Sequence, residues 1–380
     1  MKKAYYRILG ILFGFFIFGF YLANMIAKDT TFSDLENRVL AQKPKFSMDN
    51  LLEGRFTEKY ETYINDQFVL RNNFVSLKSS VDEALGKVEN NGIYKGRDDY
   101  LLEGFKVPDQ ELVNENIEAI NKFTKKHKDI KSYFLLAPTS SAVLKSNMPS
   151  NVPYVDQLDY MNDFGAKLVD VKYINPYATL FTNKDEYIYY KTDHHWTTMG
   201  AYYAYTDFCS ALKIKAKTLD DYDKNLVSTQ FYGTYFSKAL FSRDKGDDIN
   251  VFTPKDKNDR YIVEYVEEKE KNTSMYASEY LEKRDKYGMF LKGNHPLVRI
   301  TTTAKLEKKK KILIFKDSYA NSFVPFLTSH YTDITLVDPR YYYGNIEDLI
   351  KQDGYDEILY LYNAGTFFSD NSLSTVLNNE

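Results

Sequence analysis

The stretch that decides the fold runs from Lys311 to Tyr362 and reads KILIFKDSYANSFVPFLTSHYTDITLVDPRYYYGNIEDLIKQDGYDEILYLY. Its apolar runs have the length and continuity of buried strands, and they lie at 311–315, 333–338 and 357–362. Helical patterns separate these runs, at 318–331 and 345–352. Near-continuous apolar strands that alternate with helices are typical of a mainly parallel sheet covered on both faces.

The same alternation continues upstream of this stretch. A helical pattern at 108–127 precedes the apolar run from Ser132 to Pro138. Weaker patterns predict two short strands within 91–104, a helix at 160–168, and strands at 169–171 and 187–190. Between about 213 and 310 the alternation fades into a polar, tyrosine-rich stretch, which we interpret as an insertion. We therefore predict an α/β domain whose functional edge is formed by the carboxyl ends of its strands.

The N-terminus carries an uncharged apolar segment from Ile8 to Ile26, which follows Lys2, Lys3 and Arg7. As a helix this segment is long enough to span a bilayer core, and the basic residues before it place the N-terminal end in the cytoplasm. A cleaved secretory signal is the competing interpretation, but the apolar run is longer than usual and no clean small-x-small site precedes Lys28. We predict a transmembrane anchor within residues 1–28, with the remaining chain extracytoplasmic.

Residues 29–88 carry two helical patterns. Ser47 is placed to cap the first helix, and a second amphipathic helix runs from Asn72 to Leu85. One face of the second helix is apolar and carries Phe74, Leu77, Val81 and Leu85. We predict that residues 29–88 form a membrane-proximal helical segment and that the catalytic domain covers 89–380.

The overall composition restricts the function classes. A net charge of -3 gives no basic field, so nucleic acid is not indicated as a partner. The single cysteine, Cys209, excludes an intramolecular disulfide and a cysteine-based structural zinc site. The sequence contains no G-x-G-x-x-G or phosphate-loop pattern, so we expect no nucleotide or coenzyme cofactor.

Ser318 follows the strand at 311–315, at the point where a helix begins. A serine in this place lies at the carboxyl edge of the sheet, and the N–H groups of the following turn point toward an oxyanion formed beside it. The alternative interpretation is that Ser318 or Asp317 only caps the helix.

A serine nucleophile needs an imidazole base and a carboxylate that orients the base. In the stretch YKTDHHWTTMG, residues 190–200, Asp193 and His195 point to the same face if the chain is extended, and His194 points away. We therefore predict that Asp193, His195 and Ser318 meet at the sheet edge. A metal site built on Asp193, His194 and His195 is the competing hypothesis, but we expect none because adjacent histidines of an extended chain diverge.

These two motifs carry a family resemblance. TDHHW at 192–196 followed by KDSYAN at 316–321 resembles the DHHW protein family, which is related to the SGNH-type alginate O-acetyltransferases. Further similar stretches are SDLENRVLAQKP, INDQFVLR, NGIYKGRDDYLLEG, FYGTYFSK, LKGNHP, PFLTSHY, VDPRYY and YLYNAG. The resemblance implies a three-layer SGNH-hydrolase-like domain in which Asp193 is the acid, His195 the base and Ser318 the nucleophile. Lys316 replaces the glycine of the wider Gly-Asp-Ser motif.

Four more residues are candidates for binding. The backbone N–H groups near Tyr319, together with Asn363, are placed to hold an oxyanion, and the position of Asn363 matches a polar residue of the related enzymes. Arg340 lies beyond a strand end, where it is placed to hold an anionic or sugar group. Trp196 is placed to shape a pocket or to form a sugar platform. Packing or salt bridges account equally well for Trp196, Arg340 and Asn363.

The expected chemistry is acyl transfer. By resemblance, the chain adds acetyl groups to a cell-envelope or secreted polysaccharide, and a multipass membrane acetyl-transfer protein supplies the acetyl group. A polysaccharide O-acetyl esterase uses the same acyl-enzyme and is the first alternative. A non-catalytic carbohydrate-binding or scaffold protein of a polysaccharide-modifying complex is the second.

Overall fold

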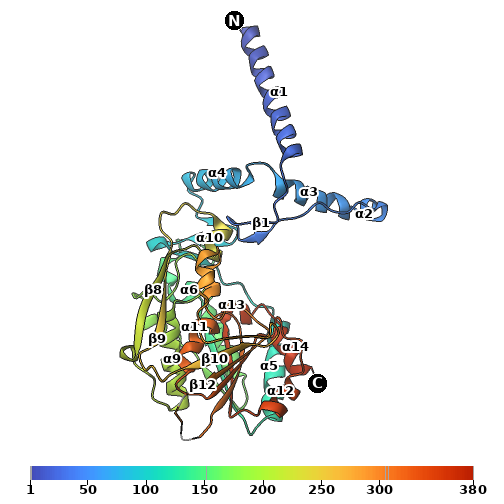
Figure 1. Cartoon of the computed structure of the whole chain (residues 1–380). Helices are drawn as coiled ribbons and strands as arrows, with labels where there is room; N and C mark the ends of the chain where they lie inside the picture. Colours follow the sequence, from blue (N-terminus) through green and yellow to red (C-terminus); the bar gives the residue numbers. More distant parts are fainter. Residues whose placement is uncertain (1, 151, 304, 307, 380) are drawn as a thin grey trace. The chain divides into compact units, whose positions relative to one another are not determined.

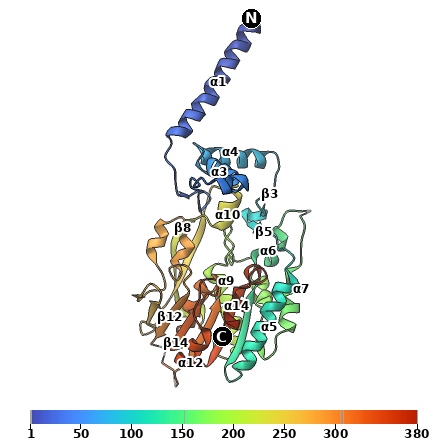
Figure 2. The same cartoon turned by 90° about the vertical axis from the view of Figure 1, so that its right-hand side faces the viewer.

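The computed structural model describes residues 2–150, 152–303, 305–306 and 308–379 of the 380-residue chain (Figure 1). The chain forms two compact units. Unit 1 comprises Met1–Asn90 with Ser237–Ser242, and unit 2 comprises Asn91–Phe236 with Arg243–Glu380. Figure 2 gives a second view of the same elements.

Unit 2 is built around an eight-stranded sheet with the strand order β11-β10-β12-β14-β13-β15-β6-β7. Its strands are β6 (Lys131–Ala137), β7 (Val171–Ile174), β10 (Tyr261–Tyr265), β11 (Glu270–Asn272), β12 (Leu297–Thr302), β13 (Lys311–Lys316), β14 (Asp333–Val337) and β15 (Glu357–Asn363). The neighbours β14, β13, β15, β6 and β7 pair in parallel, whereas β10, β11 and β12 pair antiparallel. The central sheet is therefore mainly parallel, as predicted.

Alternate side chains of each central strand pack on opposite faces of the sheet. Ile312 and Ile314 of β13 belong to one hydrophobic cluster, and Leu313 and Phe315 belong to the other. The first cluster includes residues of α9 (Thr198–Leu212) and α11 (Ala320–Phe323). The second includes residues of α5 (Gln110–Lys126), α7 (Gln157–Ala166), α12 (Ile346–Asp353) and α14 (Ser372–Asn378). Helices thus cover both faces, which explains why these strands are apolar throughout.

The other elements of unit 2 are short. They are β4 (Ile93–Lys95), η1 (Arg97–Asp99), β5 (Leu101–Glu103), α6 (Ser140–Val143), η2 (Lys145–Asn147), α8 (Tyr177–Thr182), η3 (Leu219–Asp221), η4 (Ser278–Glu282), η5 (Lys286–Met289), η6 (Val324–Leu327) and α13 (Ala364–Phe367). β8 (Tyr222–Phe231) and β9 (Asp247–Pro254) form an antiparallel pair, and α10 (Thr234–Ala239) lies between them in the chain. The predicted helix at 318–331 is only α11 followed by η6, because Pro325 has no N–H to continue α-helical hydrogen bonding.

One prediction about the sheet was wrong. Residues 187–190 form no strand of the sheet, because this segment folds back on its own continuation: the N–H of Thr197 donates to Ile188 O at 2.9 Å, and Tyr189 bridges Trp196. The stretch 213–310, interpreted as an insertion, supplies β10, β11 and β12 to the sheet. These strands lack continuous apolar runs because their buried and exposed side chains are mixed.

Unit 1 begins with α1 (Lys2–Ile26), which is long and apolar enough to cross a membrane. A signal sequence near the N-terminus can have the same length and apolar composition. The further elements are β1 (Phe32–Ser33), β2 (Arg38–Val39), α2 (Met48–Leu52), α3 (Arg55–Gln67), α4 (Arg71–Ala84) and β3 (Glu89–Asn90). Ser47 caps α2 as predicted, and Gly54, with a φ of 76°, separates α2 from α3.

Polar contacts hold unit 1 together. The carboxylate of Asp66, on α3, accepts hydrogen bonds from Arg38 at 2.5 and 2.9 Å and from the N–H of Ala41 at 2.8 Å. Arg71 pairs with Glu36. Among the described residues up to Asn90, none belongs to the hydrophobic clusters of the structure.

Candidate active site

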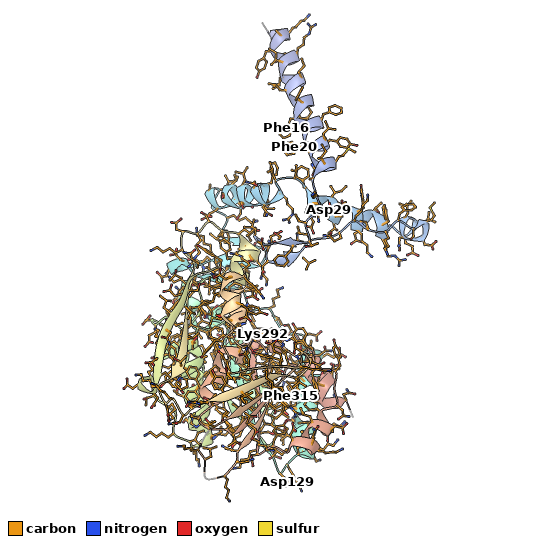
Figure 3. All side chains as sticks on the ribbon, in the orientation of Figure 1. Phe16, Phe20, Asp29, Asp129, Lys292 and Phe315 are labelled. Atoms are coloured by element: carbon orange, nitrogen blue, oxygen red, sulfur yellow. The ribbon has the colours of Figure 1, made fainter. Side chains whose placement is uncertain are left out.

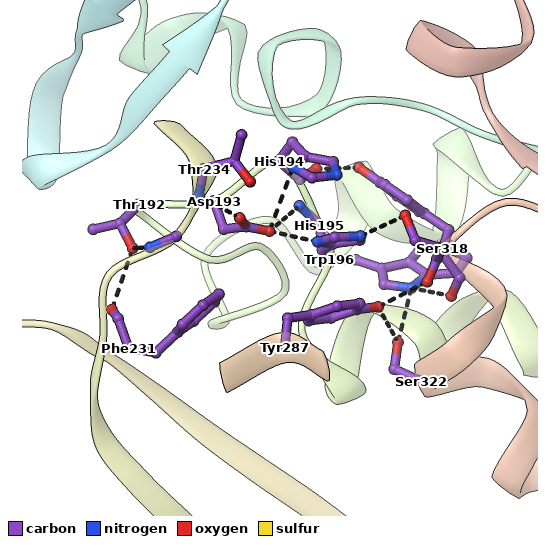
Figure 4. A network of polar contacts seen from close by, with 12 residues as sticks. Thr192, Asp193, His194, His195, Trp196, Phe231, Thr234, Tyr287, Ser318 and Ser322 are labelled. Carbon is purple, nitrogen blue, oxygen red and sulfur yellow. Dashed lines mark hydrogen bonds and ion pairs between the residues drawn. The ribbon is translucent and has the colours of Figure 1, made fainter. Parts of the chain in front are cut away.

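The candidate site lies where two loops of unit 2 meet. Ser318 lies two residues after the end of β13, at the carboxyl edge of the parallel strands. Asp193 and His195 lie in the loop before α9, whose first turn is capped by Thr197: the N–H of Gly200 donates to Thr197 Oγ1. Figure 4 shows Asp193, His195 and Ser318 side by side.

The structure brings the three predicted side chains into a chain of contacts. Nε2 of His195 lies 2.7 Å from Oγ of Ser318, and Nδ1 of His195 lies 2.5 Å from Oδ1 of Asp193 (Figure 4). All three residues are buried, with exposed fractions of 9% for Ser318, 5% for His195 and 2% for Asp193. This is the order of contacts in which an imidazole can accept the serine proton while a carboxylate stabilises its charged form.

Asp193 is fixed from two sides. Its Oδ2 accepts the N–H of Thr234 at 2.7 Å, and its Oδ1 also accepts the N–H of His195 at 3.1 Å. Gly233 is required here, because a Cβ at this position would lie 2.3 Å from the Cβ of Asp193. Burial favours the neutral acid, but the charges of His194 and His195 and the hydrogen bonds to the carboxylate outweigh it and hold the pKa of Asp193 well below its usual range.

Asp247, on β9, anchors the start of the loop that carries Asp193. Its carboxylate accepts the N–H groups of Lys191 at 2.9 Å and Thr192 at 2.7 Å, and the hydroxyl of Tyr187 at 2.6 Å. Burial raises the pKa of Asp247 despite these hydrogen bonds. The stretch that the sequence marked only as a polar insertion therefore supplies a residue that positions the site.

Tyr287 is a site residue that the sequence analysis missed. Its ring stacks on the imidazole of His195, with centroids 3.6 Å apart and an interplanar angle of 9°. Its hydroxyl donates to the backbone oxygen of Ser318 at 3.1 Å and lies 3.3 Å from Oγ of Ser322 (Figure 4). No sequence motif around Tyr287 predicts this role, because the contact depends on how η5 packs in the folded chain.

The prediction that Trp196 forms a sugar platform was wrong. The indole is fully buried, with an exposed fraction of 0%, so neither face is available to a sugar. Its Nε1 donates to the backbone oxygen of Tyr319 at 3.0 Å and to Oγ of Ser322 at 3.1 Å. Trp196 therefore braces the turn that follows Ser318, which agrees with the packing alternative.

The predicted oxyanion donors have another partner. The N–H of Tyr319 donates to Asp317 Oδ1 at 2.9 Å, and both the N–H and Nδ2 of Asn363 donate to Asp317 Oδ2, at 2.9 and 2.6 Å. The other hydrogen of Asn363 Nδ2 is directed to Thr366 Oγ1 at 2.7 Å. The donors of Tyr319 and Asn363 are therefore directed to a buried carboxylate in this structure, and the oxyanion role of the N–H groups near Tyr319 stays a prediction. Asp317 ties the ends of β13 and β15 together.

Arg340 and Lys316 belong to a buried ionic network. Nε and Nη2 of Arg340 donate to the two oxygens of Asp338 at 2.8 and 2.6 Å. Nζ of Lys316 lies 3.5 Å from Asp338 and donates to Asn321 and Asn294 at 2.8 and 3.1 Å. Burial lowers the pKa of Lys316. Arg340 therefore has the salt-bridge role that was its alternative, and Lys316 links β13 to β14 where the wider pattern has glycine.

His194 does not point away from the site, as the extended-chain argument predicted. Its ring lies 3.8 Å from that of His195, and its Nδ1 lies 3.6 Å from Oδ1 of Asp193. The reason is that residues 191–195 form bends and the alternation of an extended strand does not apply. One ligand atom from each of Asp193, His194 and His195 lies within 4.8 Å of the others, so the group has the composition of a partial metal site. A metal ion here would compete with the His195 to Asp193 contact.

The protein is thus a mainly parallel α/β protein in which Asp193, His195 and Ser318 lie together near the carboxyl edge of the sheet. The model of the DHHW protein family matches residues 142–337, just over half of the chain, and the chain therefore belongs to this family. A comparison with curated proteins gave no match.

Solved structures share the fold. A DHHW family protein from Eubacterium siraeum aligns with a TM-score of 0.67 and 25% identity, covering 77% of this chain and 97% of that one. Bacillus cereus PatB1 with a sulfonyl adduct aligns with a TM-score of 0.63 and 22% identity, covering 74% of this chain and 97% of that one. A second PatB1 structure gives a TM-score of 0.61 at 22% identity, over 72% and 97% of the two chains.

Proposed function

We propose that this protein is a serine-dependent acyltransferase that acetylates hydroxyl groups of a cell-envelope or secreted polysaccharide outside the cytoplasm. The observation that carries the proposal is the line of contacts from Asp193 through His195 to Ser318, at 2.5 and 2.7 Å. Membership of the DHHW family supports it, as does the resemblance of the two motifs to those of the SGNH-type alginate O-acetyltransferases. The resemblance also supports an SGNH-hydrolase-like assignment of the three-layer domain.

The proposed first step forms an acyl-enzyme. Oγ of Ser318 attacks the carbonyl carbon of an acetyl ester while Nε2 of His195 accepts the hydroxyl proton, and Asp193 stabilises the resulting imidazolium. The tetrahedral intermediate collapses, and the leaving alcohol takes the proton from His195. The backbone N–H of Ser318 has no hydrogen-bond acceptor within the described part of the chain, so it is the donor that we assign to the oxyanion.

The second step transfers the acetyl group. A sugar hydroxyl attacks the carbonyl carbon of the acyl-enzyme, His195 accepts its proton, and Ser318 leaves as the hydroxyl after taking that proton. Tyr287 keeps the imidazole plane fixed in both steps through its stacking contact. If water takes the place of the sugar hydroxyl, the same sequence makes the protein an acetyl esterase.

The proposed location follows from the N-terminus. Residues 1–28 form a cytoplasmic tip and a single membrane-spanning helix, residues 29–88 a membrane-proximal segment, and residues 89–380 the catalytic domain. The apolar composition of α1 supports the anchor. A multipass membrane protein is the proposed source of acetyl groups, since the donor has to cross the membrane to reach this domain.

Acetyl release from an activated aryl acetate tests the enzymatic proposal. The full chain in detergent is compared with Ser318→Ala and His195→Ala, and with Ser80→Ala as a control for an exposed serine far from the site in sequence. We expect release from the wild type and the control only. Equal release from all four proteins would remove the enzymatic proposal and leave the non-catalytic carbohydrate-binding or scaffold function.

Acceptor oligosaccharides separate the two enzymatic alternatives. Oligosaccharides are added to the active protein with the aryl acetate, and the products are analysed by mass spectrometry. Acetylated sugar that depends on both Ser318 and His195 supports a transferase, whereas free acetate without acetylated sugar supports an esterase.

A further inference from the structure

Helix α4 turns its apolar face outward. The side chains of its apolar stripe have large exposed fractions: Phe74 43%, Leu77 60%, Val81 47% and Leu85 81%. We call these four residues the α4 stripe. The buried residue of α4 is instead the polar Ser79, whose Oγ donates to the backbone oxygens of Leu240 at 2.8 Å and Ala239 at 3.3 Å. An amphipathic helix at a protein surface normally shows the reverse arrangement.

Helix α3 repeats this arrangement. Its buried residue is Asp66, held by Arg38 and the N–H of Ala41, while Ile64 is exposed by 46%. Polar contacts within unit 1 thus help to set the positions of both helices. The rings of Phe20 and Phe68 contact Phe74, but the side chains of the α4 stripe remain largely exposed. Contiguous exposed apolar surface marks an interaction site in a stable protein.

The α4 stripe is continuous with the end of the membrane-spanning candidate α1. The ring of Phe20 lies 5.9 Å from that of Phe74 and stacks on Phe68 with centroids 5.8 Å apart. Asn24 Oδ1 accepts the N–H of Val69 at 2.8 Å. Figure 3 labels Phe16 and Phe20 on α1, and Asp29 in the segment that follows α1. Whatever surrounds Phe20, in the last two turns of α1, therefore also reaches Phe74, the first residue of the α4 stripe.

We propose that the α4 stripe inserts into the outer surface of the same bilayer that α1 spans, so that α4 is an interfacial helix. This inference rests on the proposed membrane anchor. Lipid is favoured over a protein partner because Phe74 contacts Phe20, which as part of α1 lies in the bilayer. Lys78 borders the stripe with an exposed side chain that pairs with Asp82, and a lysine beside the apolar face is usual for interfacial helices.

Site-directed fluorescence in lipid vesicles tests this placement. Leu77→Cys and Val81→Cys carry an environment-sensitive fluorophore in the stripe, Ser76→Cys carries it on another face of α4, and Phe15→Cys carries it on α1. The native Cys209 is buried and stays unlabelled. The full chain is reconstituted into phosphatidylcholine and phosphatidylglycerol vesicles that contain lipids with a nitroxide quencher in the acyl chain.

We expect blue-shifted emission and strong nitroxide quenching at positions 15, 77 and 81. Quenching at position 76 should be about threefold weaker, because an interfacial helix buries only its apolar face, by about 5–10 Å. Measuring two stripe positions keeps the test valid if one labelled variant fails to fold.

Three outcomes would overturn the inference. Equal quenching at 76 and 77 means that the stripe is not inserted. A blue shift at 77 and 81 without nitroxide quenching means that a protein surface or a second copy covers the stripe. Absence of quenching at 15 removes the anchor as well. Aryl acetate turnover of the same samples is a separate measurement, which depends on the active site with Ser318 and His195 and not on the position of the stripe. Failure of the membrane placement and failure of the enzymatic proposal are therefore distinguishable.

Discussion

The two units of this protein differ in whether their apolar side chains are buried. In unit 2, Leu313, Phe315 and Ile358 are fully buried between the sheet and its helices. In unit 1 the buried residues of α3 and α4 are Asp66 and Ser79, while Leu77 and Leu85 are exposed. Burial of apolar surface stabilises unit 2 in water, whereas unit 1 is held largely by polar contacts and leaves much of its apolar surface exposed.

This difference in burial agrees with the different functions that we propose for the two units. The candidate chemistry needs side chains held to within fractions of an ångström, and a densely packed sheet edge provides that. Membrane contact needs an accessible apolar face and tolerates small displacements. The proposals above place the two tasks in unit 2 and unit 1 respectively.

The largest expected effect is a loss of activity that occurs when unit 2 is changed but not when unit 1 is changed. Ser318→Ala should lower aryl acetate turnover at least about a thousandfold, because the nucleophile is lost. Leu77→Asp in unit 1 should leave the turnover of this soluble substrate within about twofold, as is usual for an exposed position away from the chemistry. The measurement is the rate of nitrophenol release in detergent. A comparable loss of turnover in Leu77→Asp would contradict the assignment of activity to unit 2 alone.

The same chemical change should have unequal effects on stability in the two units. Leu313→Ala removes a fully buried side chain and should destabilise unit 2 by about 2–5 kcal/mol. Leu77→Ala, at an exposed position, should cost about 0.5 kcal/mol or less in detergent.

Urea unfolding checks this pair of variants with two signals. Fluorescence of Trp196, the only tryptophan, reports on unit 2, and far-ultraviolet circular dichroism reports on the whole chain. A large change of either signal's midpoint in Leu77→Ala would show that the stripe is packed in the absence of lipid, contrary to the exposed fractions.

The buried carboxylates of unit 2 should show opposite pH dependences. The pKa of Asp193 is held below its usual value, so its stabilising effect is present above about pH 4 and is lost as the pH falls further. Asp193→Asn should therefore be destabilised relative to wild type by about 1–3 kcal/mol at pH 7 and by less below about pH 4.

Asp247→Asn is the matched comparison for this prediction. Burial raises the pKa of Asp247, so ionisation costs folding free energy as the pH rises above the unfolded value near 3.9. The stability of wild type relative to Asp247→Asn should therefore fall as the pH rises through this range. Thermal unfolding midpoints measured from pH 3 to 7 test both signs, and parallel curves for the two variants would contradict them.

The smallest expected effect concerns single tyrosine hydroxyls. Tyr287→Phe keeps the ring on His195 but removes the hydrogen bond to the backbone of Ser318, so turnover should fall about fivefold, which corresponds to about 1 kcal/mol. Tyr63→Phe removes a comparable hydroxyl from unit 1, where it donates to Asp29, and should leave turnover unchanged. Equal turnover of Tyr287→Phe and wild type would reduce the role of Tyr287 to stacking.

Local sequence predicted the elements with the strongest patterns. The runs at 132–138, 311–315, 333–338 and 357–362 are β6, β13, β14 and β15, because side chains apolar on both faces of a strand need cover from both sides. The prediction for 187–190 failed since that segment pairs with its own continuation, an outcome that composition does not encode.

For the site, sequence predicted which atoms are present but not all of their partners. Asp193, His195 and Ser318 were expected together and lie together. Tyr287 was missed, and the expected oxyanion donors of Tyr319 and Asn363 are directed to Asp317. These contacts join segments far apart in the chain, so residue type and spacing alone do not determine them.

By itself, then, the sequence determined the mainly parallel α/β core and the order of the DHHW and KDSYAN motifs, because hydrophobic period and residue chemistry are local properties. Only the tertiary structure decided that Trp196 is buried, that His194 turns toward the site, and that the apolar face of α4 points outward. Whether a side chain is buried depends on what packs against it, and that neighbour is chosen by the whole fold.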